Sequence, residues 1–119
     1  MAILVETTVP DTGRLSVHVH ADLEIKISAA EAQARVTQFV HARISSQMHG
    51  STPLLVLKEK PAWQVPVHLT FPSIGDAGAV GTIAVDIESG EMNTSAFVIE
   101  DIERHAEQVA ARFARTTAS

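Results

Sequence analysis

Residues 14–28 read RLSVHVHADLEIKIS, and their side chains alternate between apolar and polar types along the stretch. Successive side chains of a strand point to opposite faces of a sheet, so this alternation predicts a strand over 14–27 with one buried face and one polar face. The stretch 3–9 is rich in β-branched residues, and a turn sequence, VPDTG, follows at 9–13. These features predict an N-terminal β-hairpin over residues 1–27.

The predicted strand 14–27 is long for a chain of this size. Its 14 residues would span roughly 46 Å at about 3.3 Å each, whereas a compact chain of this length is only about 35 Å across. We therefore expect the hairpin to project as an arm, unless a bulge near Ala21 and Asp22 folds it back. A projecting apolar face needs cover, and the simplest cover is a second copy of the chain. The predicted homodimer interface comprises Ile3, Val5, Leu15, Val17 and Val19.

Two helices are predicted in the remainder of the chain. Ser28 and Glu31 have the spacing of a capping box, which marks the start of the first helix, and Gly50 is expected to close that helical region. The second helix is expected to begin near 95–98. Each helix carries a single apolar stripe, formed in the first by Ala32, Val36, Phe39, Val40 and Ile44 and in the second by Ile99, Ile102, Ala106, Val109 and Phe113.

Three strands are predicted between these helices, over 54–58, 63–71 and 79–88, with a loop at 72–78. The first is apolar on both faces, which favours a central position. Pro66 cannot donate to a ladder, so its strand is expected at an edge or with a bulge.

The resulting order is β-β-α-β-β-β-α. Because most elements have one apolar face, it predicts an α+β fold with two layers, in which both helices cover one face of an antiparallel sheet. We expect a single domain, 1–119, made of an arm at 1–27 and an α-β-β-β-α body at 28–119.

Composition excludes several classes of protein. The chain has 119 residues, no cysteine and a formal net charge of −5. The absence of cysteine excludes disulfides and thiolate zinc sites, and the acidic balance argues against nucleic acid as a partner. No apolar run approaches the length of a membrane span, and the N-terminus does not resemble a signal peptide, so a cytoplasmic protein without a membrane partner is expected.

The polar face of the predicted strand 14–27 is the first candidate site. His18, His20 and Asp22 would share this face, and imidazole and carboxylate are ligands for divalent metals. His68 or Asp86 could add a third ligand from a neighbouring strand. The alternative is that these residues form a solvated surface that binds no metal.

His68 and Asp86 are also candidates for acid–base chemistry, because alternation places both on the polar face. However, the sequence has no cysteine, no tyrosine and no Gly-x-Ser-x-Gly motif to supply a nucleophile. We therefore expect a non-enzymatic protein without a cofactor, whose candidate binding face comprises His18, His20, Asp22, His68 and Asp86. Trp63 begins an apolar strand face, and we expect it in the core or a dimer interface rather than at a ligand.

Two stretches resemble known families. The segment WQVPV at 63–67, together with VDIESGE at 85–91, resembles the second half of PepSY-type domains. That resemblance implies a small non-catalytic module, of a family often linked to protease propeptides and inhibition. The segment TGRL at 12–15 is similar to the swapped arms of AbrB-like antitoxins, which implies a dimeric regulator. The leading interpretation is a self-associating binding module that regulates a partner protein; the alternatives are a metal-binding protein and an antitoxin-like regulator.

Overall fold

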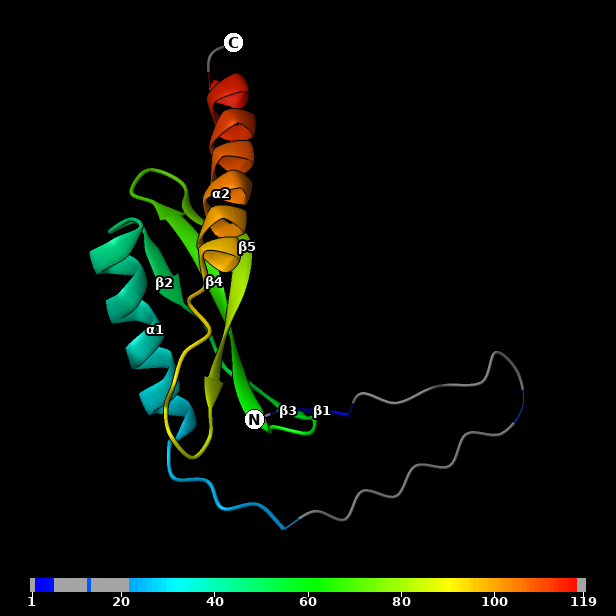
Figure 1. Cartoon of the computed structure of the whole chain (residues 1–119). Coiled ribbons are helices and arrows are strands. Elements are labelled where there is room, and N and C mark those ends of the chain that lie inside the picture. The colour runs from blue at the N-terminus through cyan, green and yellow to red at the C-terminus, as the bar shows by residue number, and fades with distance from the viewer. Residues whose placement is uncertain (1, 6–12, 14–21, 118–119) are drawn as a thin grey trace.

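The computed structural model describes residues 2–5, 13 and 22–117 (Figure 1). Its elements, in chain order, are β1 (Ala2–Val5), α1 (Ala29–Arg43), β2 (Met48–Gly50), β3 (Leu54–Leu57), β4 (Ala62–Phe71), β5 (Gly75–Asp86) and α2 (Ala96–Thr117). The two helices and the antiparallel β2, β3, β4 and β5 confirm the predicted α+β class. In the described part of the chain, neither helix is both long and apolar enough to cross a membrane.

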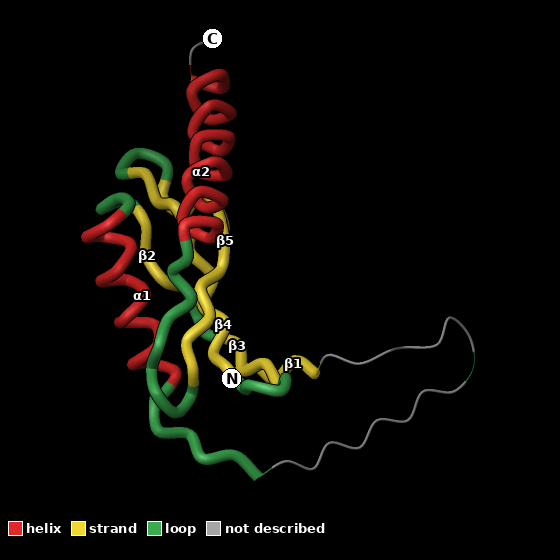
Figure 2. The backbone as a smooth tube through the Cα atoms, in the orientation of Figure 1, coloured by secondary structure: helices red, strands yellow, loops and turns green. Residues whose placement is uncertain are grey.

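Strand β4 is the centre of the sheet (Figure 2). Strand β5 pairs with it along one edge over its whole length, while β2 and β3 occupy successive stretches of the other edge. Strand β3 also pairs in parallel with β1, which confirms the central position predicted for 54–58.

Pro66 lies in this central strand, at a break in the ladder. Gly50 is opposite Val67 and Leu54 is opposite Gln64, so the edge formed by β2 and β3 contains one extra residue. The Pro66 carbonyl accepts a hydrogen bond from the Ser51 N–H at 2.7 Å. In an antiparallel strand the nitrogen and the carbonyl of one residue face the same edge, so the Pro66 nitrogen, which has no hydrogen to donate, also faces the bulge. Of the two arrangements expected for this strand, an edge position or a bulge, the structure shows the bulge.

The core lies between one face of the sheet and both helices, as predicted. Four alternate residues of β4 are buried: Trp63, Val65, Val67 and Leu69. They belong to one cluster with Ala32, Val36 and Val40 of α1 and with Ile102 and Val109 of α2. The opposite face carries the other side chains of β4 and β5. We call it the helix-free face and define it by Ala62, Gln64, Pro66, His68, Thr70, Thr82, Ala84 and Asp86.

Helix α1 begins as predicted. The Ser28 Oγ accepts a hydrogen bond from the Glu31 N–H at 3.1 Å, and the Glu31 carboxylate lies 3.4 Å from that hydroxyl. The helix ends at Arg43, and Gly50 is part of β2 rather than a helix terminus, which corrects the expectation. A Cβ at Gly50 would lie 3.0 Å from both the Gln33 carbonyl oxygen and Val65 Cγ1. A methyl group at this position would therefore require the backbone of α1 or the Val65 side chain to shift.

The strand predicted over 14–27 is wrong in its described part, because residues 22–27 form no strand. The N–H groups of Lys26 and Ile27 both donate to the Ile87 carbonyl at 2.9 Å. Leu23 and Ile25, which were expected to face the core, are 36% and 43% exposed. Residues 22–27 therefore alternate between apolar and polar side chains although their apolar side chains are not all buried.

The partner of the N-terminal strand was not predicted. Strand β1 pairs in parallel with β3, with Ile3 opposite Leu55 and Val5 opposite Leu57. Residues 2–5 are thus a strand of the sheet rather than part of a projecting arm. The predicted pairing of this segment with 14–20 lies outside the described residues.

The loop expected at 72–78 is also wrong, since β5 begins at Gly75. The β4–β5 ladder shifts register between Val67 and His68 and again between Leu69 and Thr70. At each shift β5 contains one residue more than β4, and the two strands remain paired beyond it. Gly75 has φ +87°, a conformation that glycine adopts without steric cost.

Candidate binding surface on the helix-free face

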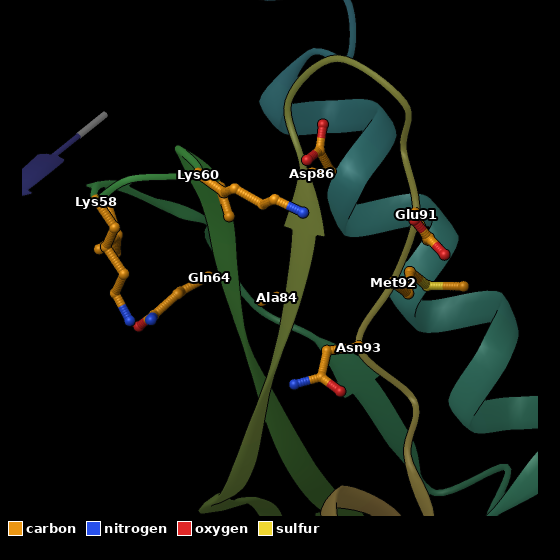
Figure 3. A pocket seen from close by; sticks show the side chains of 10 residues that line it. Lys58, Lys60, Gln64, Ala84, Asp86, Glu91, Met92 and Asn93 are labelled. Atoms are coloured by element: carbon orange, nitrogen blue, oxygen red, sulfur yellow. The ribbon is translucent and has the colours of Figure 1, made fainter.

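A hollow of about 410 Å³ opens on the helix-free face near the β3–β4 turn (Figure 3). Its lining residues are Val56, Lys58, Lys60, Ala62, Gln64, Ala84, Asp86, Glu91, Met92 and Asn93. The short side chains of Ala62 and Ala84 leave the space. Figure 3 shows Lys58 and Lys60 on the side of β4, and Asp86 and Glu91 on the side of β5. We call it the charged hollow.

A second hollow, of about 450 Å³, shares Lys60 and Asp86 with the first. Its lining adds four more carboxylates, from Asp22, Glu24, Glu59 and Glu88. Leu23, which is 36% exposed, also lines it. This end of the sheet therefore combines acidic groups with an exposed apolar side chain.

The carboxylate of Asp86 organises the turn that bounds the charged hollow. Its Oδ1 accepts hydrogen bonds from the N–H groups of Ser89 at 3.0 Å and Glu88 at 2.8 Å. These two bonds, that of Ser89 foremost, lower the pKa of Asp86 from its ordinary value of 3.8. The Asp86 N–H donates to the Glu91 carbonyl and the Asn93 N–H donates to the Ala84 carbonyl, both at 2.9 Å. Residues 91–93 are thereby held along the edge of β5.

Contacts with the core fix the turn that follows Asp86 relative to the sheet. The indole Nε1–H of Trp63 donates to the Ile27 carbonyl at 2.7 Å, and Ile27 in turn donates its N–H to Ile87. Arg35 of α1 reaches the Gly90 carbonyl at 3.4 Å. Trp63 is 1% exposed, which confirms the core position expected for it.

A second polar group lies at the other end of the helix-free face. His49 and His68 are directly opposite each other on β2 and β4, and their ring centroids are 5.9 Å apart. Nδ1 of His68 lies 2.8 Å from Asp76 Oδ2, and Nδ1 of His49 lies 3.3 Å from the Thr70 hydroxyl. A hydrogen bond from the Gly78 N–H, followed by that from His68, lowers the pKa of Asp76. We call His49, His68, Thr70 and Asp76 the histidine cluster.

The histidine cluster was only partly accessible to sequence analysis. The alternation along its strand placed His68 on the polar face, together with Asp86. In the structure, however, the carboxylate beside His68 is that of Asp76 and not that of Asp86. Asp86 pairs with Ala62, which is six residues along β4 from His68, a separation of roughly 20 Å in a strand. His49 could not be recognised, because the sequence did not predict β2.

The remaining predicted site residues are spread over the chain. Asp22 is exposed and lines the second hollow. Ile3 and Val5 belong to β1. The predicted residues outside the described part are His18, His20, Leu15, Val17 and Val19. Within residues 2–5, 13 and 22–117, no group of three or more histidine, aspartate or glutamate side chains is arranged to hold a metal ion.

Replacing Asp86 with asparagine is expected to destabilise the protein at neutral pH, with a difference that shrinks in acid. The folded state lowers the pKa of Asp86 from 3.8, so the stabilisation is present above this unfolded value and is lost as the pH falls through the lower folded value. Urea unfolding of both proteins at neutral pH and at about pH 3 measures this difference. Glu100→Gln, which changes an exposed carboxylate of α2, is the matched control. A difference that stays constant into acid would contradict the proposed role of the carboxylate.

The helix-free face therefore carries two polar regions, the charged hollow at one end and the histidine cluster at the other. Both are built from residues that β4 brings together with its neighbouring strands. Comparison with known proteins adds no family to this description, because no family model, curated protein or solved structure matches the chain.

Proposed function

We propose that this chain is a small non-enzymatic binding module that self-associates through its helix-free face, with the charged hollow at a two-fold axis. The observation that carries the proposal is the distribution of charge around the hollow. Lys60 stands on one side and Glu91 on the other. A two-fold interface uses the same surface on both copies, so that surface has to complement itself. A two-fold axis in the plane of the interface, running between the two sides of the hollow, places the lysine side of one copy against the carboxylate side of the other.

The floor of the charged hollow suits close approach. Val56 is fully buried on this face, and Ala62 and Ala84 are half-buried. Ala62 and Ala84 expose little but short apolar groups, while the charged groups stand at the sides. Interfaces commonly have this arrangement of an apolar centre and a polar rim. A standard interface covers about 800 Å² of each partner, which is a small part of the 7999 Å² of accessible surface here.

Ala84→Arg is expected to weaken self-association by more than tenfold, because a long charged side chain would fill the centre of the interface. The measurement is the mass of the native chain in light scattering or sedimentation over a series of concentrations. Ala42→Arg, on the exposed side of α1, introduces the same side chain away from the helix-free face and is expected to leave the mass unchanged. A native chain that stays monomeric, or equal effects of both variants, would overturn the proposal.

The N-terminal residues predicted from the sequence offer a different interface. Val17→Asp tests it in the same assay, because an acidic side chain would disrupt an apolar contact between two arms. If Val17→Asp dissociates the dimer and Ala84→Arg does not, the arm and not the helix-free face joins the copies. If the charged hollow is the interface, moderate salt is expected to weaken association, since rim charges are screened.

A further inference from the structure

His49 and His68 form a pair of imidazoles on neighbouring strands. They are directly opposite on antiparallel strands, so both side chains stand on the helix-free face. The centroids of their rings are 5.9 Å apart and the ring planes are tilted by 44°. A zinc ion lies about 2.0–2.1 Å from each imidazole nitrogen that binds it. An ion bound to one nitrogen of each ring would therefore sit between them.

The hydrogen bonds of the two imidazoles leave the same nitrogen of each ring available. Nδ1 of His68 lies 3.0 and 2.8 Å from the two carboxylate oxygens of Asp76. An ionised carboxylate only accepts hydrogen bonds, so the tautomer of the neutral His68 ring that fits this contact has its proton on Nδ1 and its lone pair on Nε2. The Thr70 hydroxyl, 3.3 Å from Nδ1 of His49, is able to accept a hydrogen bond in the same way. Metal-binding histidines in proteins commonly have this arrangement, in which an outer carboxylate or hydroxyl orients the ring.

From this arrangement we propose that Nε2 of His49 and Nε2 of His68 bind one divalent transition-metal ion, of the class of Zn²⁺, Ni²⁺ or Cu²⁺. Imidazole nitrogens suit these ions, whereas Mg²⁺ and Ca²⁺ require oxygen ligands. Asp76 is a positioning residue, because it holds His68 through Nδ1 and does not bind the ion. This inference does not depend on the proposed self-association, because the histidine cluster lies at the other end of the face from the charged hollow.

Space for further ligands is present beside His49. A hollow of about 570 Å³ there is lined by His49 and Thr70, together with His41 and Ser46, whereas His68 does not line it. Zinc prefers four ligands, and two histidines leave two positions of a tetrahedral ion for water or for a donor group of another molecule. The site would therefore be an open one.

The test is titration of the untagged full chain with ZnCl₂ and NiCl₂, followed by calorimetry and by the imidazole signals in NMR spectra. One ion per chain is expected, with shifts of the His49 and His68 signals. His49→Ala and His68→Ala are each expected to lower the affinity at least tenfold. Asp76→Asn keeps a hydrogen-bond acceptor but not the charge, and it is expected to weaken binding by about 10–100-fold. His49→Gln, a milder change, gives the same result if His49→Ala impairs folding.

Two controls separate this site from other histidines. His105→Ala changes an exposed histidine of α2 and is expected to leave the affinity unchanged. The double variant His18→Ala and His20→Ala removes the pair predicted from the sequence and is also expected to bind as the native chain does. The proposal is overturned if the native chain takes up no ion at millimolar metal, or if only the His18 and His20 variant loses binding. Light scattering with a chelator present reports on self-association separately, so failure of one proposal is distinguishable from failure of the other.

Discussion

Replacing Trp63 with alanine is expected to lower the free energy of unfolding by about 3–5 kcal/mol, the range for large buried aromatic side chains. The Trp63 side chain is 1% exposed and belongs to the core cluster between the sheet and the helices. Its truncation removes packing between β4 and the helices and also leaves the Ile27 carbonyl without the donor that lies 2.7 Å away. Urea unfolding followed by circular dichroism measures the loss, because Trp63 is the only tryptophan and its fluorescence disappears with it.

Two variants separate the contributions within this effect. Trp63→Phe keeps an aromatic ring but removes the indole N–H, and it is expected to cost about 1–3 kcal/mol because a buried acceptor loses its partner. Phe97→Ala is the control, because Phe97 is 86% exposed and surface changes of this kind are usually within about 0.5 kcal/mol. If Trp63→Ala is no more destabilising than Phe97→Ala, the assignment of Trp63 to the core is wrong.

Gly81→Ala is expected to lower the free energy of unfolding by about 1–3 kcal/mol through overpacking. A Cβ at this position of β5 would lie 2.5 Å from Ile102 Cγ1, and Ile102 is itself 1% exposed. Helix α2 or the strand would have to move to relieve the contact. The expected loss shows as a lower urea midpoint with an unchanged slope.

A double-mutant cycle with Ile102→Ala tests the cause, because this change removes the Cγ1 atom that the new methyl group would meet. Ile102→Ala alone is expected to cost about 2–5 kcal/mol. If the clash is the cause, the double variant is expected to be more stable than the sum of the single effects predicts, because the truncated side chain makes room for the new methyl group. Additive effects would show that Gly81 is required for another reason.

Much of the architecture was predictable because it depends on local patterns. The capping residue Ser28 and the apolar stripe of α1 belong to one continuous stretch of chain, and the alternation over β4 is uninterrupted. The start of α2 at Ala96 was likewise expected from its stripe. Pro66 indicated a bulge or an edge because proline lacks an N–H, although the sequence alone did not distinguish between the two.

The same reasoning failed for residues 22–27, and the failure has a definite cause. Alternation shows only that a strand could bury one face; it does not show that a ladder partner exists. Here Lys26 and Ile27 share a single acceptor on Ile87, and Leu23 and Ile25 remain in contact with water. The prediction of a strand over 22–27 therefore depended on pairing with another strand, and the local sequence does not determine that pairing.

The candidate sites show the same division. By itself, the sequence determined the α+β class, both helices, the central position of β3 and the presence of His68 and Asp86 on one face, because period and parity act within an element. Only the tertiary structure decided that β1 joins β3, that β2 exists, and that His68 meets His49 and Asp76. Those contacts depend on the register between strands distant along the chain, and each bulge in β5 reverses the parity on which a prediction from sequence relies.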